Sequence, residues 1–247
     1  TEITQLYDLD KPNLNTGLVA FYPFNGNAND ESGNNNNGTI EGATLTTDRF
    51  SNENKAFNFN GVNNRVIIPF NSNLYNPEIS ISTWVKFNEL NGTYQCLIIA
   101  NNDGWAGFAL IFENNKLQWL DYNGYYYNAS IEVPLINLNT SDWYNFVIVR
   151  SLSDLKLYRN GELIGSQSNL SPYNRPTSSP IAIGSHSFSI SDHPFNGKMD
   201  DTRIYGRLLT QSEIIQLYQN ESFLTLKSPI GGETIYKGNT YSIKWNS

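Results

Sequence analysis

The feature that most constrains the fold is a series of short β-rich runs separated by tight-turn dipeptides. The runs lie at 65–69, 79–87, 96–100, 108–112, 144–150, 155–159 and 181–183. The turn dipeptides are Asn60-Gly61, Asn91-Gly92, Asp103-Gly104, Asn123-Gly124, Asn160-Gly161 and Asn196-Gly197. Asn and Gly tolerate the positive φ angles that tight hairpins need. Many short strands with regular turn signals predict an all-β sandwich or barrel.

The run at 79–87 indicates how one such strand faces its surroundings. Its two alternating sets are Ile79, Ile81, Thr83, Val85 and Phe87 on one side, and Ser80, Ser82, Trp84 and Lys86 on the other. Successive side chains of a strand point to opposite faces, so one face is apolar and the other is mixed. This alternation predicts one layer of two packed sheets. Trp84 is then either buried on the outer side of its sheet or exposed on a concave binding face.

A single helix is predicted near the end of the strand-rich region. Thr210-Gln-Ser-Glu213 is a capping box, and Ile214, Leu217 and Tyr218 recur at helical spacing. Leu208 and Leu209 precede the cap and are placed to staple the start of the helix, which we expect to end near Asn220.

The chain divides into three segments on this pattern. Residues 1–16 are interpreted as an N-terminal linker and 17–222 as the sandwich domain. Residues 223–247 are interpreted as the start of a second β-sandwich module or as a linker hairpin, because so short a segment cannot bury a core of its own. Residue 1 is not Met and no signal peptide is present, so we expect an excised or mature segment.

Composition excludes several classes of protein. The formal net charge of −7 argues against a nucleic-acid partner or an anionic membrane surface. No apolar run is long enough to insert into a membrane. An aromatic content of 13% argues against disorder. The single cysteine, Cys96, lies in an apolar run and is predicted to be a buried strand residue without a disulfide or a zinc site. Two histidines are too few to support a histidine metal centre.

Seven segments follow one another in the order of a known family. They are 17–26, 29–39, 56–61, 81–85, 143–165, 181–185 and 195–210, and they include Ala56-Phe-Asn-Phe-Asn-Gly61 and Met199-Asp-Asp-Thr-Arg-Ile-Tyr205. Together they resemble the laminin G-like domain of the concanavalin A-like lectin/glucanase superfamily over about residues 17–220. The resemblance implies a two-sheet antiparallel jelly-roll sandwich in an extracellular, modular protein. The segment Ser228-Pro-Ile-Gly-Gly-Glu233 resembles the start of a bacterial extracellular Ig-like module.

Two carboxylates stand out against this background. If 199–205 is a strand, Asp201 shares a face with Met199, Arg203 and Tyr205, and Asp200 points toward the core with Thr202 and Ile204. A buried carboxylate is costly unless it is paired or bound to a metal, and no Lys or Arg is an obvious partner for Asp200. Calcium accepts carboxylate, amide and carbonyl oxygens at irregular spacing, and the loop at 29–37 offers such oxygens.

The family resemblance implies a structural calcium between that loop and the final strand. By position it implies ligands at Asp30 and Asp200, with Ser32, Asn35 and Gly61 as further candidates. The alternative is that Asp30 only caps a turn and that Asp200 accepts backbone N–H bonds.

Aromatic and amide residues gather between 101 and 128. The rings are Trp105, Trp119, Tyr122, Tyr125, Tyr126 and Tyr127, and Asp121 lies among the acids and amides between them. Flat rings cover the C–H face of a sugar, while amides, acids and guanidinium groups bind its hydroxyls. The candidate glycan ligands are Asn102, Asp103, Trp105, Tyr122, Tyr125, Tyr127, Arg175 and His186. Ordinary packing of these rings within the sandwich is the alternative.

No catalytic pattern is recognised. The related glycosidases carry two or three acids at alternate positions of one strand, and no such motif occurs here. We therefore predict a non-catalytic, lectin-like module that binds polysaccharide, in a secreted or cell-surface protein with covalently linked neighbouring domains. A structural or adhesion module that binds protein or acts as a spacer is the alternative, and a glycan-cleaving enzyme is a remote one.

Overall fold

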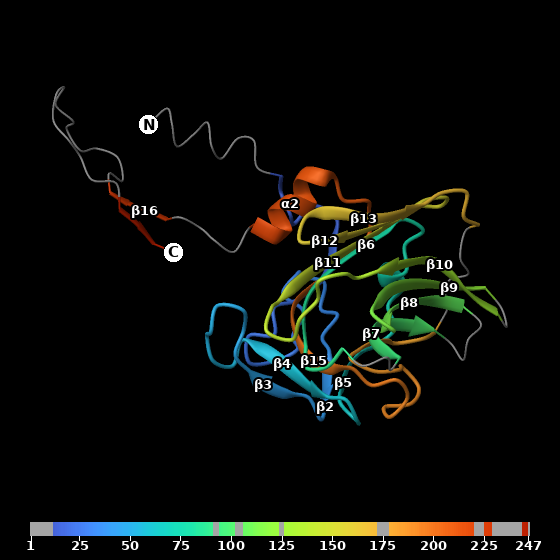
Figure 1. Cartoon of the computed structure of the whole chain (residues 1–247), viewed down its shortest axis with the longest axis horizontal. Coiled ribbons are helices and arrows are strands. Elements are labelled where there is room, and N and C mark those ends of the chain that lie inside the picture. The colour runs from blue at the N-terminus through green and yellow to red at the C-terminus, as the bar shows by residue number, and fades with distance from the viewer. Residues whose placement is uncertain are drawn as a thin grey trace, which may run out of the picture.

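A computed structural model describes residues 12–90, 94–101, 106–123, 126–171, 178–219, 225–228 and 244–246. For 101, 123, 126–130, 225–228 and 244–246 it describes the backbone alone. Two antiparallel sheets form a sandwich, and helix α2 (Gln211–Gln219) lies beside one of them (Figure 1). This confirms the prediction of an all-β, two-sheet jelly roll with one short C-terminal helix. None of the described helices is long and apolar enough to cross a membrane.

The first sheet has eight strands and carries both the first and the last strand of the sandwich. Its order is β13 (Glu162–Gln167), β12 (Leu155–Arg159), β11 (Tyr144–Arg150), β6 (Ile79–Phe87), β15 (Asn196–Tyr205), β4 (Ala56–Asn60) and β3 (Thr44–Thr46), with β1 (Leu18–Tyr22) paired to β15.

The second sheet has seven strands, four of which follow one another as a meander. Its order is β10 (Tyr126–Pro134), β9 (Lys116–Asn123), β8 (Ala106–Glu113), β7 (Gln95–Asn101), β14 (Ile181–Ile183), β5 (Arg65–Ile68) and β2 (Thr39–Glu41). A short 3₁₀ helix at Ser72–Leu74 follows β5. Separately, β16 (Thr225–Ser228) pairs with β17 (Lys244–Asn246) in the segment predicted to contain a hairpin.

The main core lies between the two sheets, and β6 shows how the sequence builds it. Ile79, Ile81, Val85 and Phe87 are buried in this core, as the alternation predicts. The ring of Phe87 lies 4.5 Å from that of Phe112 on the opposite sheet, measured between centroids. Each buried ring contributes about 2–3 kcal/mol of transfer free energy, so such contacts across the sandwich dominate its cohesion.

Trp84 lies on the other face of β6 and is buried there, which settles the choice between the two predicted positions. Its ring is stacked on Tyr218 of α2 at 5.9 Å between centroids, and the guanidinium of Arg49 lies 4.7 Å from its centre. Helix α2 also buries Ile214 and Leu217 against the outer face of the eight-stranded sheet. This outer face is therefore occupied by the protein's own residues where the helix lies.

The start of α2 is the predicted capping box. The amide N of Thr210 donates to Oε2 of Glu213 at 2.8 Å, and the amide N of Glu213 lies 3.4 Å from Oγ1 of Thr210. Arg207 adds two further donors to the same carboxylate, at 2.9 and 2.6 Å. These hydrogen bonds, with the one from Arg207 foremost, hold the pKa of Glu213 below its ordinary value of 4.5. Leu209 packs in the same cluster as Ile214, as the predicted staple requires.

A buried ion pair joins the two sheets. Arg150, at the end of β11, is fully buried and donates from Nε and Nη2 to Oδ2 of Asp121 in β9, at 3.0 and 2.9 Å. The other carboxylate oxygen accepts from Nε1 of Trp119 at 2.7 Å. Trp119 is itself fully buried and stacks on Phe108. Trp119 and Asp121, two residues of the aromatic and amide cluster predicted between 101 and 128, therefore lie in the core. For these two residues the alternative of ordinary packing within the sandwich is correct.

We expect Asp121→Asn to lower the free energy of unfolding by about 3–5 kcal/mol, because it leaves the buried Arg150 without its counter-charge. Glu132→Gln on the neighbouring strand is the matched control. It breaks the exposed pair between Lys116 and Glu132 and should cost less than about 1 kcal/mol. Urea unfolding measures both. If both variants lowered the free energy of unfolding equally, the buried inter-sheet pair would matter no more than an exposed pair.

We expect Glu213→Gln to lower the free energy of unfolding by about 1–3 kcal/mol at pH 7, because it weakens the charged hydrogen bonds to Arg207. The folded-state pKa of Glu213 is depressed, so its contribution is present above pH 4.5 and is lost as the pH falls through the folded value. The difference from the parent protein should therefore shrink in acid. Glu162→Gln, at an exposed position of β13, should change neither the free energy of unfolding nor its dependence on pH. If the difference in free energy between Glu213→Gln and the parent protein stayed constant down to pH 3, this account would be contradicted.

Candidate functional site

The outer face of the seven-stranded sheet carries a second apolar cluster. Its buried members are Cys96, Ile99, Ala109, Ile111, Leu120, Tyr122 and Ala182. Cys96 is fully buried there, as predicted, and burial raises the pKa of its thiol. The small side chains of Ala109 and Ala182 leave room on this face for larger side chains to lie over the strands.

Two tyrosines lie over that cluster. Tyr94, directly before β7, packs against it and makes a side-chain hydrogen bond with Tyr122 of β9. Burial, foremost, and the interactions with Tyr122 raise the pKa of the Tyr94 hydroxyl. Gly107, opposite Tyr122 in β8, adopts a φ of +130°, which other residues rarely adopt, and brings no side chain against the ring. Tyr122 is only 7% exposed, so its ring serves packing more than open contact.

His193 extends this aromatic surface. Its ring lies 4.2 Å from that of Tyr94 between centroids, and 46% of its side chain is exposed. The backbone O of His193 accepts from the amide N of Cys96 at 2.9 Å, which fixes the histidine beside the start of β7. Neither Tyr94 nor His193 is among the glycan ligands predicted from the sequence. The signal for Tyr94 is its place two residues before Cys96, on the same side of the strand.

The predicted ligand His186 lies in the same loop as His193, and its amide N donates to the carbonyl of Asp192 at 3.2 Å. Its Nδ1 accepts from the amide N of Phe188, and its carbonyl accepts from Arg65 of β5 at 2.8 Å. In the sheet order β5 stands four strands from β9, which is about 19 Å at 4.8 Å per strand. His186 is thus anchored beside Arg65, and the structure does not place it beside Tyr122.

The other predicted glycan ligands fall outside the described side chains. Asn102, Asp103, Trp105, Tyr125 and Arg175 are among the residues that are not described, and Tyr127 is described by its backbone alone. The backbone does show where their segments begin. β7 ends at Asn101 and β9 ends at Asn123. Both strands are antiparallel to β8, which lies between them, so their C-terminal ends lie at the same end of the sheet. Tyr94, before the start of β7, lies at the opposite end of that strand, and Tyr122 lies one residue before the end of β9.

Asp200 does not face the inter-sheet core, contrary to prediction. It is paired with Trp84 in β6, and Arg203 and Tyr205 are paired with Ser82 and Ser80. All of these lie on the outer face. A β-bulge between Asp200 and Arg203, with Asp201 at a φ of +42°, inserts one residue and reverses the alternation. Asp200 is nevertheless only 2% exposed, because side chains cover it on the outer side.

The expectation that Asp200 lacks a cationic partner is also wrong. Nη1 of Arg49 pairs with Oδ2 of Asp200, and Nη2 pairs with Asp201 at 2.5 Å. Arg203 approaches Asp201 at 3.6 Å. Burial and the adjacent Asp201 raise the pKa of Asp200, while Arg49 opposes that rise. The guanidinium of Arg49 thus occupies the position beside this carboxylate for which a cation was predicted.

Asp30 is held by backbone donors. Its Oδ1 accepts from the amides of Phe21 and Ser32, and its Oδ2 accepts from the amide of Asn36, each at 2.9 Å. The hydroxyl of Ser32 donates to Val19 O at 3.0 Å. These contacts match the alternative in which Asp30 organises the turn, and three of its roughly four lone-pair positions are already used.

The five predicted calcium ligands do not form one site. Asn35 lies in the Asp30 loop, with a φ of +60°. Gly61 donates to the carbonyl of Phe195, beyond the start of β15, whereas Phe21 is paired with Arg203 near its end. The two points are roughly 20 Å apart at about 3.3 Å per residue. No group of three His, Cys, Asp or Glu side chains suited to a metal occurs among the residues whose side chains are described. As arranged, these residues do not fit a shared ion.

Comparison with known proteins identifies the family to which this architecture belongs. A laminin G-type family model, described as concanavalin A-like lectin/glucanases superfamily, matches residues 60–215, more than half of the chain. Domain 4 of AbnA, a GH43 extracellular arabinanase from Geobacillus stearothermophilus solved in complex with arabinotriose, is 24% identical, with a TM-score of 0.65 over 82% of this chain and 98% of that one.

The receptor binding domain of botulinum neurotoxin C/D mosaic serotype is 20% identical, with a TM-score of 0.67 over 86% of this chain. The chain spans about half of that domain, 53% of its length. No curated protein sequence matches the chain. At these identities the likeness of structure shows a shared fold, and the family match extends through most of both sheets. The chain therefore belongs to the concanavalin A-like lectin/glucanase superfamily.

Proposed function

We propose that the chain is a non-catalytic carbohydrate-binding module whose glycan lies along the outer face of the seven-stranded sheet. The observation that carries the proposal is the aromatic surface of Tyr94 and His193 on this face, against which Tyr122 packs from below. It runs from Tyr94 toward the strand ends at Asn101 and Asn123, after which the predicted aromatic and amide segments continue. A sugar chain presents C–H faces to such rings and hydroxyls to the amides beside them.

The occupied outer face of the other sheet supports this choice of face. Helix α2 and Arg49 cover Trp84 there, whereas His193 remains 46% exposed beside Tyr94. A few contacts between rings and sugars yield micromolar to millimolar affinity, about −4 to −8 kcal/mol. Modules of this strength act through avidity with linked domains.

The relatives support a glycan ligand and an extracellular setting. The arabinanase domain that matches along nearly its whole length was solved with arabinotriose and belongs to an extracellular enzyme. We propose the same setting for this chain, in a secreted or cell-surface protein with further domains. The interpretation of 223–247 as the start of an Ig-like module is part of this proposal.

The acids of the seven-stranded sheet support a binding role without catalysis. Among the described side chains, Glu41 pairs with Arg65, Asp121 with Arg150, and Glu132 with Lys116. Glu113 accepts from Gln118 at 3.4 Å. Glycoside hydrolysis needs two carboxyl groups about 5–10 Å apart that both face the substrate. We propose that none of these engaged acids acts in that way.

Affinity electrophoresis in gels that contain neutral plant and microbial polysaccharides tests the function. The parent protein should be retarded by at least one of them, and Tyr94→Ala should lose most of that retardation. Tyr94→Phe should keep it, because the ring supplies the contact and the fold is retained. Phe50→Ala removes a 49% exposed ring from the eight-stranded side and is the matched control. Unretarded migration of the parent protein in every gel would favour the spacer or adhesion role instead.

The structural calcium remains a proposal that rests on the family resemblance, confined to the Asp30 loop. Its oxygens come from Asp30, Ser32 and Asn35, and an ion there would displace amide donors that Asp30 now accepts. We expect calcium to raise the melting temperature of the parent protein and of Asp200→Asn, but not that of Asp30→Ala. Melting curves that are identical with calcium and with a chelator would rule the ion out.

A further inference from the structure

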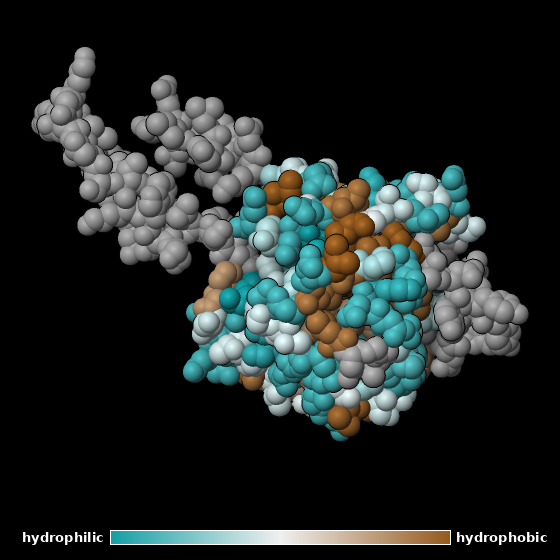
Figure 2. All heavy atoms as spheres, viewed as in Figure 1, coloured by the Kyte–Doolittle hydropathy of each residue, from teal (hydrophilic) through white to brown (hydrophobic). Residues whose placement is uncertain are grey.

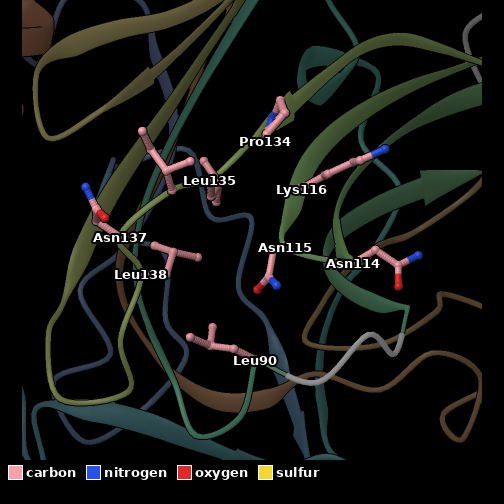
Figure 3. A pocket seen from close by; sticks show the side chains of 9 residues that line it. Leu90, Asn114, Asn115, Lys116, Pro134, Leu135, Asn137 and Leu138 are labelled. Atoms are coloured by element: carbon pink, nitrogen blue, oxygen red, sulfur yellow. The ribbon is translucent and has the colours of Figure 1, made fainter.

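A pocket opens beside the end of the seven-stranded sheet where β7 begins. Its volume is about 490 Å³, within the range of about 300–1,000 Å³ that holds small ligands. The two-residue turn between β8 and β9 forms one wall, and the segment 134–138 that follows β10 forms another (Figure 3). Leu90 closes the third side. Because Gln95 of β7 is paired with Phe112, this turn lies at the same end of the sheet as Tyr94.

The lining combines an apolar floor with amide groups. Leu90, Leu135 and Leu138 supply apolar surface, Asn115 lies between the two walls, and Asn114 and Asn137 lie at the outer sides of the pocket (Figure 3). All three asparagines are exposed. The apolar surface of the pocket meets the needs of the C–H face of a sugar ring, and the amides can both donate to and accept from its hydroxyls.

The three asparagines differ from most others in this Asn-rich chain. Many of the others cap turns: Oδ1 of Asn60 accepts from the amides of Val62 and Asn63, and Oδ1 of Asn139 accepts from those of Ser141 and Asp142. Within the described side chains, no such hydrogen bond engages the amides of the three pocket asparagines. Their amides therefore keep their full capacity for a ligand.

The walls are held in place without those amides. The backbone N of Leu135 donates to the carbonyl of Asn115 at 2.7 Å, which ties the two walls together. The carbonyl of Ile136 accepts from Nη1 of Arg159 at 2.9 Å. Asn114, Asn115 and Asn137 all adopt positive φ angles, of 50°, 58° and 60°, which close the tight turns. A pocket so braced loses little conformational entropy when a ligand enters.

The charges around the pocket select a neutral ligand. Among the residues that the structure describes, Lys116 is the one charged residue that lines it, and its ammonium is paired with Glu132. Figure 3 shows the Lys116 side chain directed away from the cavity. No described acid lines the pocket to attract a cation, and no unpaired base lines it to attract a uronate or a sulfate.

We propose that this pocket binds one unit of a neutral saccharide chain whose other units lie on the Tyr94 surface. The proposal rests on the proposed function and adds to it a second contact and a class of sugar. Because the pocket lies at one end of the Tyr94 surface, a saccharide chain that fills both would bind in one direction only.

The test follows the side-chain amide signals of the ¹⁵N-labelled full chain by NMR. The signals of Asn115 and Asn137 are assigned by their loss in Asn115→Gly and Asn137→Gly, because glycine keeps the positive φ and removes the amide. Asn169→Gly is the control, since Asn169 is exposed and has a φ of 61° but does not line the pocket. The probes are arabinotriose, xylotriose, cellotriose and mannotriose, with trigalacturonic acid as the acidic counterpart.

We expect at least one neutral trisaccharide to shift the amide signals of Asn115 and Asn137 to saturation. Each glycine variant should raise its Kd about three- to tenfold, the loss of one or two hydrogen bonds, and Asn169→Gly should not change it. A neutral probe that binds without moving these signals, and whose Kd the glycine variants leave unchanged, would overturn the pocket while the proposed function stands. Tighter binding of trigalacturonic acid would overturn the neutral class. No binding of any probe would overturn the pocket, and the electrophoresis with Tyr94→Ala would then decide the function separately.

Discussion

The buried pair of Arg150 and Asp121 sets how the two sheets face each other. It joins the end of β11 to Asp121 near the end of β9, and the carboxylate also accepts from the indole of Trp119. The free energy needed to remove both charges from water offsets most of their mutual attraction, so the pair adds little net stability. Its effect is selective: any other register of the sheets would leave a charge buried without its partner. The carbonyl of Ser171 also accepts from Arg150 at 2.8 Å, so the segment after β13 depends on the same residue.

With the sheets placed in this way, the two outer faces acquire different roles. Helix α2 and the Arg49 cluster cover part of the eight-stranded face, and Trp84 is buried in that packing. Apolar surface viewed from one side is concentrated where the edges of the two sheets meet (Figure 2). There Gly165 of β13 approaches Val133 of β10 so closely that a Cβ atom would lie 2.4 Å from it. The outer face of the seven-stranded sheet, with its tyrosines and the Asn-lined pocket at its end, is the surface that we propose for a ligand.

Much of the fold can be predicted from local sequence, and the predictions that were wrong failed for physical reasons. The strands at 79–87, 144–150 and 155–159 and the capping box of α2 were predicted because alternation and capping act over a few residues. Asp200 was assigned to the wrong face because a bulge at Asp201 breaks the period of two. Its partner Arg49 lies 151 residues away, and no local pattern reveals such a contact. Tyr94 was missed for a similar reason, since its role depends on Tyr122 two strands away.

The central claim is that a glycan lies on the outer face of the seven-stranded sheet. The most direct measurement is a crystal structure of the protein soaked with fragments of the polysaccharide that retards it most. The account predicts sugar density against Tyr94 and His193, continuing toward the strand ends at Asn101 and Asn123. Density confined to the eight-stranded side of the sandwich, near α2, would contradict it.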